Sequence, residues 1–232
     1  MKKKRRIFTP KYNLKPHFRG TQTFKKRSFL LSSIALAGLL INSCGKSTRL
    51  PAYYLSQHPD DKRSRQLRHY PVARQGNLTA WVTSDHVGQA AKWLYKPENP
   101  EPAHPIVGKI RSKHMPADTK HDGSFLIVRG YQGPLFKLWD GERGEGLLYN
   151  GRNWQPIWLE QGENGVNTWV YSKTKIGSWS GFPVVIGDPI EPEAIAGAMW
   201  YRDNTNPYMG GATSSSFLAN WLNKLKFENF VE

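Results

Sequence analysis

The sequence has a single cysteine, Cys44, and lacks several motifs that would assign a chemistry. If Cys44 is modified, no thiol remains for a disulfide, a cysteine metal ligand or a cysteine nucleophile. A Walker loop, a dinucleotide-binding glycine pattern and a Gly-x-Ser-x-Gly nucleophile elbow are also missing from the sequence. We therefore expect no nucleotide cofactor, and the sequence predicts no other cofactor.

Acidic residues are absent from residues 1–43, which hold eleven of the 33 Lys and Arg residues. From Cys44 onward the sequence has 22 basic and 18 acidic residues, so most of the formal charge of +15 lies near the N-terminus. The basic stretch precedes an apolar run of 13 residues, 29–41. A bilayer-spanning helix needs about 20 apolar residues, so this arrangement is typical of a signal peptide. The sequence thus predicts no nucleic-acid partner, and a nucleic-acid-binding tail is the weaker alternative.

The apolar run ends in Ile41-Asn42-Ser43-Cys44, which resembles the lipobox of bacterial lipoproteins. This resemblance implies that residues 1–43 are a cleaved signal peptide and that Cys44 receives the lipid. It also implies a protein anchored in a membrane through lipid, on the periplasmic side or at the cell surface. Residues 26–30, Lys-Arg-Ser-Phe-Leu, resemble the twin-arginine export motif, and the general secretion route stays open beside it. An uncleaved signal anchor and a buried core helix are the alternatives.

The remaining chain divides into a tether and one domain. Residues 44–64 contain Gly, Pro and charged residues with few aliphatic side chains, which is typical of a linker. Within it, Tyr53, Tyr54 and Leu55 are candidates for packing back onto the domain. Residues 65–232 are long enough for a single core, since a domain of this size buries about 70% of its unfolded surface.

The pattern of residues 65–232 predicts an α+β domain with an antiparallel sheet and two C-terminal helices. Apolar and β-branched runs predict strands at 124–131, 167–172 and 184–187, with 135–140 as hairpin partner of the first. Residues 193–202 follow Pro192 and predict a helix, and residues 214–226 place Phe217, Trp221 and Leu225 on one helical face. A further helix is expected over 85–94, capped by Asp85.

The closing segment, residues 195–208 followed by Thr213–Leu222, resembles the end of circularly permuted NlpC/P60-type (lecithin:retinol acyltransferase-like) papain-fold proteins. The resemblance implies a papain-like fold with its nucleophile at the start of a helix, where Ser214 stands. It also implies a histidine base from an upstream strand, for which His121 is the first candidate, followed by His104 and His114. The plainer interpretation of Ser214, Ser215 and Ser216 is that their hydroxyls cap a helix.

Two functions follow from these observations. The first is a non-catalytic envelope module that binds peptidoglycan or an envelope protein, which the missing thiol favours. The second is a serine hydrolase or amidase that acts on peptide or acyl bonds through Ser214 and His121, because a serine needs a histidine within hydrogen-bond reach. No metal site is predicted, since His104, His114 and His121 match no recognised ligand spacing.

Overall fold

A computed structural model describes residues 53–57, 66–85, 91–115, 121–150, 153–177 and 180–231. The predicted signal peptide, Cys44 and most of the predicted tether lie outside these residues. Within the described ranges, no helix has the length and apolar character needed to cross a membrane.

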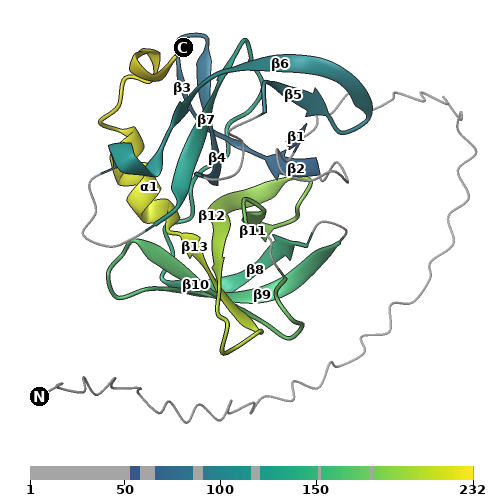
Figure 1. Ribbon diagram of the computed structural model, residues 1–232, viewed down its shortest axis with the longest axis vertical. Helices are drawn as coiled ribbons and strands as arrows, with labels where there is room; N and C mark the ends of the chain where they lie inside the picture. Colours follow the sequence, from purple (N-terminus) through teal and green to yellow (C-terminus); the bar gives the residue numbers. More distant parts are fainter. Residues whose placement is uncertain are drawn as a thin grey trace, which may run out of the picture. The chain divides into compact units, whose positions relative to one another are not determined.

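The first half of the described chain forms a seven-stranded antiparallel sheet (Figure 1). Its strand order is β2-β1-β5-β6-β7-β4-β3. A short 3-10 helix, η1 (Ser112–His114), follows β6. The strands are β1 (Tyr54–Gln57), β2 (Gln66–His69), β3 (Pro71–Gln75), β4 (Leu78–Ser84), β5 (Trp93–Lys96), β6 (Asn99–Ile110) and β7 (Gly123–Arg129). Strand β1 lies within the stretch predicted as a tether, and Tyr54 and Leu55 are buried.

The second half forms a closed antiparallel barrel in the order β10-β13-β12-β11-β8-β9. Its strands are β8 (Arg143–Tyr149), β9 (Trp154–Gln161), β10 (Asn167–Ser172), β11 (Pro183–Gly187), β12 (Pro192–Arg202) and β13 (Met209–Thr213). The helix α1 (Ser215–Leu222) and the 3-10 helix η2 (Phe227–Phe230) follow the barrel. Figure 1 shows α1 in yellow, after the last barrel strand.

Strand β12 joins the barrel to the seven-stranded sheet, because it packs against both β4 and β7. One hydrophobic cluster contains Val82 of β4, Ile127 of β7 and Ala198 of β12. Every residue of β4 is buried, so this strand is covered on both faces. The ends of β4 and β7 therefore lie where the two β units meet.

The predicted α+β class is wrong, because the described chain is mostly β with one α-helix. Residues 193–202, predicted as a helix, form strand β12 between β11 and β13. Gly197 has a φ of +138°, and a register shift near it marks a β-bulge that a regular helix does not contain. The papain-like fold implied by the NlpC/P60 resemblance is therefore also wrong, because it required a helix in this segment.

Two further elements differ from the expectation. Strand β5 occupies the end of the predicted helix 85–94, and residues 86–90 lie outside the described part. Residues 135–140 form no hairpin with β7, whose partners are β4 and β6. The strands predicted at 124–131, 167–172 and 184–187 are confirmed as β7, β10 and β11. The last predicted helix is confirmed in part as α1.

Candidate functional site

Two carboxylate residues meet at the junction of the β units. Asp85 directly follows β4 and Asp122 directly precedes β7, and these antiparallel strands pair Ser84 with Gly123. The backbone N–H of Asp85 donates to the carbonyl oxygen of Asp122 at 2.6 Å. The sequence continues from Asp85 into His86, which lies outside the described residues. The hydrogen bond therefore holds Asp85, the residue before His86 in the sequence, against Asp122.

A path of backbone contacts runs from Asp122 into the barrel. Gly123 packs against Thr213, so closely that an added Cβ would lie 2.5 Å from the threonine methyl carbon. Thr213 follows Ala212, which pairs with Met199 across β12 and β13. Met199 lies between Ala212 and the next segment, so Ala212 is two strand spacings, or about 10 Å, from that segment.

That next segment is the connection between β10 and β11, which contains Ser180. The N–H of Gly181 donates to the carbonyl of Met199 at 2.6 Å. The hydroxyl of Ser180 lies 3.5 Å from the carbonyl oxygen of Trp200, a long and weak hydrogen bond. Ser180 is partly exposed and Gly181 has a φ of +82°, a turn conformation that suits glycine. The β10–β11 turn therefore presents a serine on β12, the strand that packs against β4 and β7.

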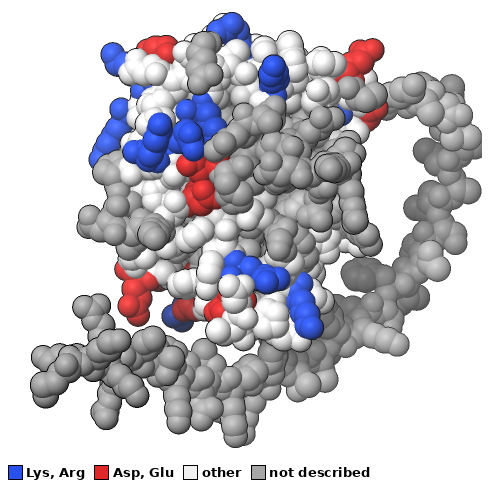
Figure 2. Space-filling view, in the orientation of Figure 1, with Lys and Arg blue, Asp and Glu red and all other residues white. Residues whose placement is uncertain are grey.

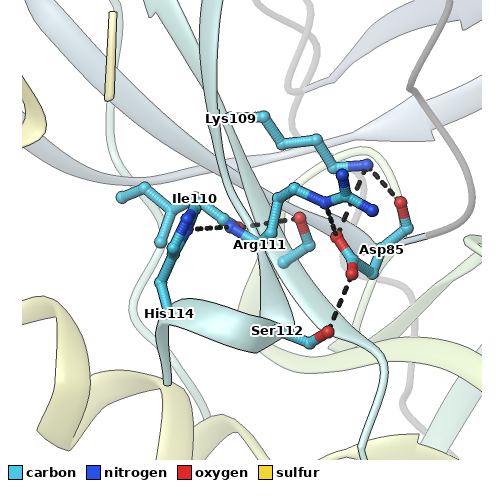
Figure 3. A network of polar contacts seen from close by, with 7 residues as sticks. Asp85, Lys109, Ile110, Arg111, Ser112 and His114 are labelled. Carbon is cyan, nitrogen blue, oxygen red and sulfur yellow. Dashed lines mark hydrogen bonds and ion pairs between the residues drawn. The ribbon is translucent and has the colours of Figure 1, made fainter. Parts of the chain in front are cut away.

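The carboxylate of Asp85 is held in a network of polar contacts (Figure 3). Its Oδ1 lies 3.3 Å from Arg111 Nε and 3.8 Å from Lys109 Nζ. Its Oδ2 accepts a hydrogen bond from the Ser112 hydroxyl at 2.7 Å, and Lys109 also donates to the Asp85 carbonyl. Burial lowers the pKa of Lys109 to about 8, and the Asp85 carboxylate opposes this shift. These contacts hold the Asp85 side chain in place, and they thereby position the backbone at the end of β4.

Ser214 and His121, the pair predicted from the sequence, both lie near the start of α1. Ser214 is 2% exposed, and its hydroxyl lies 2.7 Å from the Ser216 hydroxyl. The ring of His121 packs edge-on against Phe217, with centroids 4.9 Å apart. Burial lowers the pKa of His121, and its Nδ1 has no hydrogen-bond partner among the described residues. The described contacts of Ser214 Oγ and of the His121 ring thus run to other residues, and catalysis by the pair stays a prediction.

The capping interpretation of Ser214 is wrong, because its side chain makes no capping hydrogen bond to α1. The neighbouring Ser215 hydroxyl instead donates to the Trp139 carbonyl at 2.5 Å. These serines therefore attach the start of the helix to the barrel and to each other.

The sequence alone did not single out His86, Asp122 or Ser180 as catalytic candidates. The available signal was their position relative to three strands. His86 follows a buried strand by one residue, Asp122 directly precedes another, and Ser180-Gly181 stands just before a third. Within the described ranges, no group of three or more His, Cys, Asp or Glu side chains is arranged to hold a metal ion.

No family model and no curated protein matches this chain. Solved structures that resemble it include the Rv3671c protease of M. tuberculosis in its active form, with 15% identity and a TM-score of 0.48 over 84% of this chain and 93% of that chain. A mutant of Rv3671c in its inactive form has 14% identity and a TM-score of 0.48 over 75% of this chain and 86% of that chain. A likeness at this level assigns no function, since one fold hosts many activities.

Proposed function

We propose that this chain is a serine hydrolase that acts on peptide or acyl bonds in the cell envelope. Ser180 is the nucleophile, His86 the general base and Asp122 the carboxylate that orients the histidine. The observation that carries the proposal is the hydrogen bond from Asp85 N–H to the Asp122 carbonyl, because it joins Asp85, the residue before His86 in the sequence, to a carboxylate residue.

The chemistry requires these three groups together. A serine hydroxyl is a weak nucleophile at neutral pH, so a neutral imidazole must accept its proton as the oxygen attacks the carbonyl carbon. A carboxylate holds the imidazole in the right tautomer and stabilises the imidazolium that forms. The order His86, Asp122, Ser180 along the chain is the order of the triad in chymotrypsin-type enzymes, which are built on β-barrels.

Exposure favours Ser180 over Ser214 as the nucleophile. A nucleophile must reach a substrate carbonyl, and Ser180 is partly exposed in a turn. Ser214 is 2% exposed, and its hydroxyl bonds a second serine rather than a base.

The test compares Ser180→Ala, Ser214→Ala and Asp122→Asn by labelling with a fluorophosphonate probe and by turnover of peptide and ester substrates. We expect Ser180→Ala to abolish labelling and Asp122→Asn to lower kcat by about 10⁴-fold, as loss of the orienting carboxylate does in such triads. Ser214→Ala is the matched control and should label like the wild type.

Three results would contradict the assignment. Loss of labelling in Ser214→Ala with retention in Ser180→Ala would favour the Ser214 and His121 pair. Full labelling in both variants would exclude both serines. No labelling or turnover in the wild-type protein would leave the non-catalytic envelope-binding module as the better hypothesis.

We further propose that Cys44 carries lipid and anchors the protein on the extracytoplasmic side of a membrane. The support is the basic stretch, the short apolar run and the lipobox-like end at Cys44. Intact mass of the membrane-extracted protein should give an acylated chain that starts at Cys44, and Cys44→Ser should abolish it. An unmodified full-length chain in both proteins would refute the anchor.

A further inference from the structure

A cavity of about 830 Å³ lies on the seven-stranded sheet, beside the C-terminal segment of the described chain. Its lining comes from β6, from η1, from the residues before β5 and from residues 229–231. It contains the side chains of Lys92, Lys109, Arg111 and Lys113, and no Asp or Glu is among its described lining residues. Figure 2 shows Lys and Arg side chains gathered at the upper left of the face in view.

The C-terminal segment forms one wall of this cavity. Val231 bridges Gly108 of β6 in antiparallel fashion, and the Phe230 ring lies 5.0 Å from the ring of His114. On the sheet side the lining includes Leu126, which is fully buried, and Ile106. The cavity thus combines cationic side chains with an apolar wall at Ile106 and Phe230.

The positive charge of the cavity exceeds the negative charge beside it. Asp85 is one adjacent carboxylate, and its oxygens already contact Arg111, Lys109 and Ser112. Asp122 also acts on Lys109, so two carboxylates against four cationic side chains leave an excess of about two positive charges near the cavity. Burial lowers the pKa of His114, with a further lowering from nearby Lys113, which is the direction expected where like charges crowd. A bound anion would relieve this crowding.

We propose that the cavity binds a phosphate monoester that carries an apolar group. The phosphate oxygens accept hydrogen bonds from Lys92, Arg111 and Lys113, and the apolar group lies against the partly exposed Ile106 and Phe230. A phosphate monoester carries up to two negative charges and three acceptor oxygens, which suits a cavity lined by several cationic side chains. The volume is several times that of the ion alone, so the apolar portion has space. None of these ligand-contacting residues belongs to the proposed hydrolase triad, so the two proposals are tested separately.

The ligand can come from two sources, a soluble phosphate monoester or the phosphate of a lipid headgroup. Phenyl phosphate is the soluble probe and is titrated into the purified protein by calorimetry. Inorganic phosphate is titrated in parallel. Phosphatidylcholine vesicles that contain phosphatidic acid, whose headgroup is a phosphate monoester, test the lipid source, and pure phosphatidylcholine vesicles are the neutral reference. The double variant Lys92→Gln/Lys113→Gln removes two exposed cations of the cavity. Lys175→Gln/Lys224→Gln is the matched control, because it removes two exposed lysines that do not line the cavity.

We expect phenyl phosphate to bind more tightly than inorganic phosphate, since only the ester also contacts the apolar wall at Ile106 and Phe230. The Lys92→Gln/Lys113→Gln variant should raise its Kd about tenfold, because each exposed ion pair contributes a factor of up to about five. The control variant should keep the wild-type Kd. Vesicle binding that phenyl phosphate displaces would identify the lipid headgroup as the source, and phenyl phosphate binding without vesicle binding would identify a soluble ester.

Two outcomes would overturn the proposal. One is the absence of binding by phenyl phosphate and by vesicles containing phosphatidic acid in a protein whose circular dichroism shows a folded chain. The other is equal weakening in both double variants, because that result reports net charge rather than this cavity.

Discussion

Gly108 is the residue at which a single added methyl group tests the contact between the C-terminal segment and β6. An added Cβ would lie 1.8 Å from the Phe230 carbonyl oxygen and 2.7 Å from the Phe230 carbonyl carbon. Carbon and oxygen atoms that are not bonded normally approach no closer than about 3.3 Å. In Gly108→Ala the segment must therefore retreat by about 1.5 Å, which breaks the bridge between Gly108 and Val231.

The expected cost of Gly108→Ala is about 1–3 kcal/mol of unfolding free energy, the range for an inserted methyl group in a packed contact. For a domain of this size, 1 kcal/mol shifts Tm by about 2–4 °C, so Tm should fall by roughly 2–12 °C. Urea unfolding at 25 °C gives the free energy directly, and limited carboxypeptidase digestion reports release of the C-terminal segment.

The matched control is Gly144→Ala in β8, where the nearest atom to an added Cβ is a Trp139 ring carbon at 3.7 Å. That distance is an ordinary van der Waals contact, so the control should change stability by less than about 0.5 kcal/mol. Equal stability of Gly108→Ala and wild type, with unchanged digestion, would refute the described contact between Phe230 and β6.

Two further predictions concern buried charge. Burial lowers the pKa of His69 from 6.5 to about 4, so the unfolded chain binds the extra proton between these values and stability falls as pH drops through this window. Between pH 7.5 and 5 the wild type should lose about 2 kcal/mol more than His69→Gln in urea unfolding, and parallel pH profiles would contradict a neutral buried imidazole. The Arg68 guanidinium lies 4.4 Å from the ring centre of Tyr53 and 4.2 Å from that of Tyr149. Arg68→Lys keeps the charge but loses planar stacking, so it should cost about 1 kcal/mol in thermal unfolding, and unchanged stability would argue against the cation-π contacts.

The helix predicted over residues 193–202 shows why this fold was only partly readable from the sequence. Alanine at positions 194, 196 and 198 favours a helix by intrinsic propensity. In the barrel, residues 194–199 are buried on both faces of β12, so no alternation of polar and apolar residues marks them as a strand. Tertiary packing decides this segment. Asn167–Ser172, with its Thr, Trp, Val and Tyr, is rich in strand-forming residues and was predicted correctly.

The candidate site was hidden for a different reason. Asp122 and the residue before His86 are far apart in the sequence, and only the pairing of β4 with β7 brings them together. Strand register depends on long-range packing, which a single sequence does not reveal. His121 was predicted as the base because it stands before a recognisable strand. The adjacent Asp122 is instead the residue whose backbone carbonyl accepts the hydrogen bond from Asp85.

Tyr70 connects the two edges of the seven-stranded sheet. It is the single residue between β2 and β3, and these strands are the two ends of the seven-stranded order. The covalent chain thus joins one edge of the sheet to the other, and the Tyr70 hydroxyl donates to the Pro189 carbonyl at 2.8 Å. Exposed edges are where chains recruit one another into aggregates. Strand pairing closes the second β unit into a barrel, whereas in the first unit a single residue, Tyr70, connects the two edge strands.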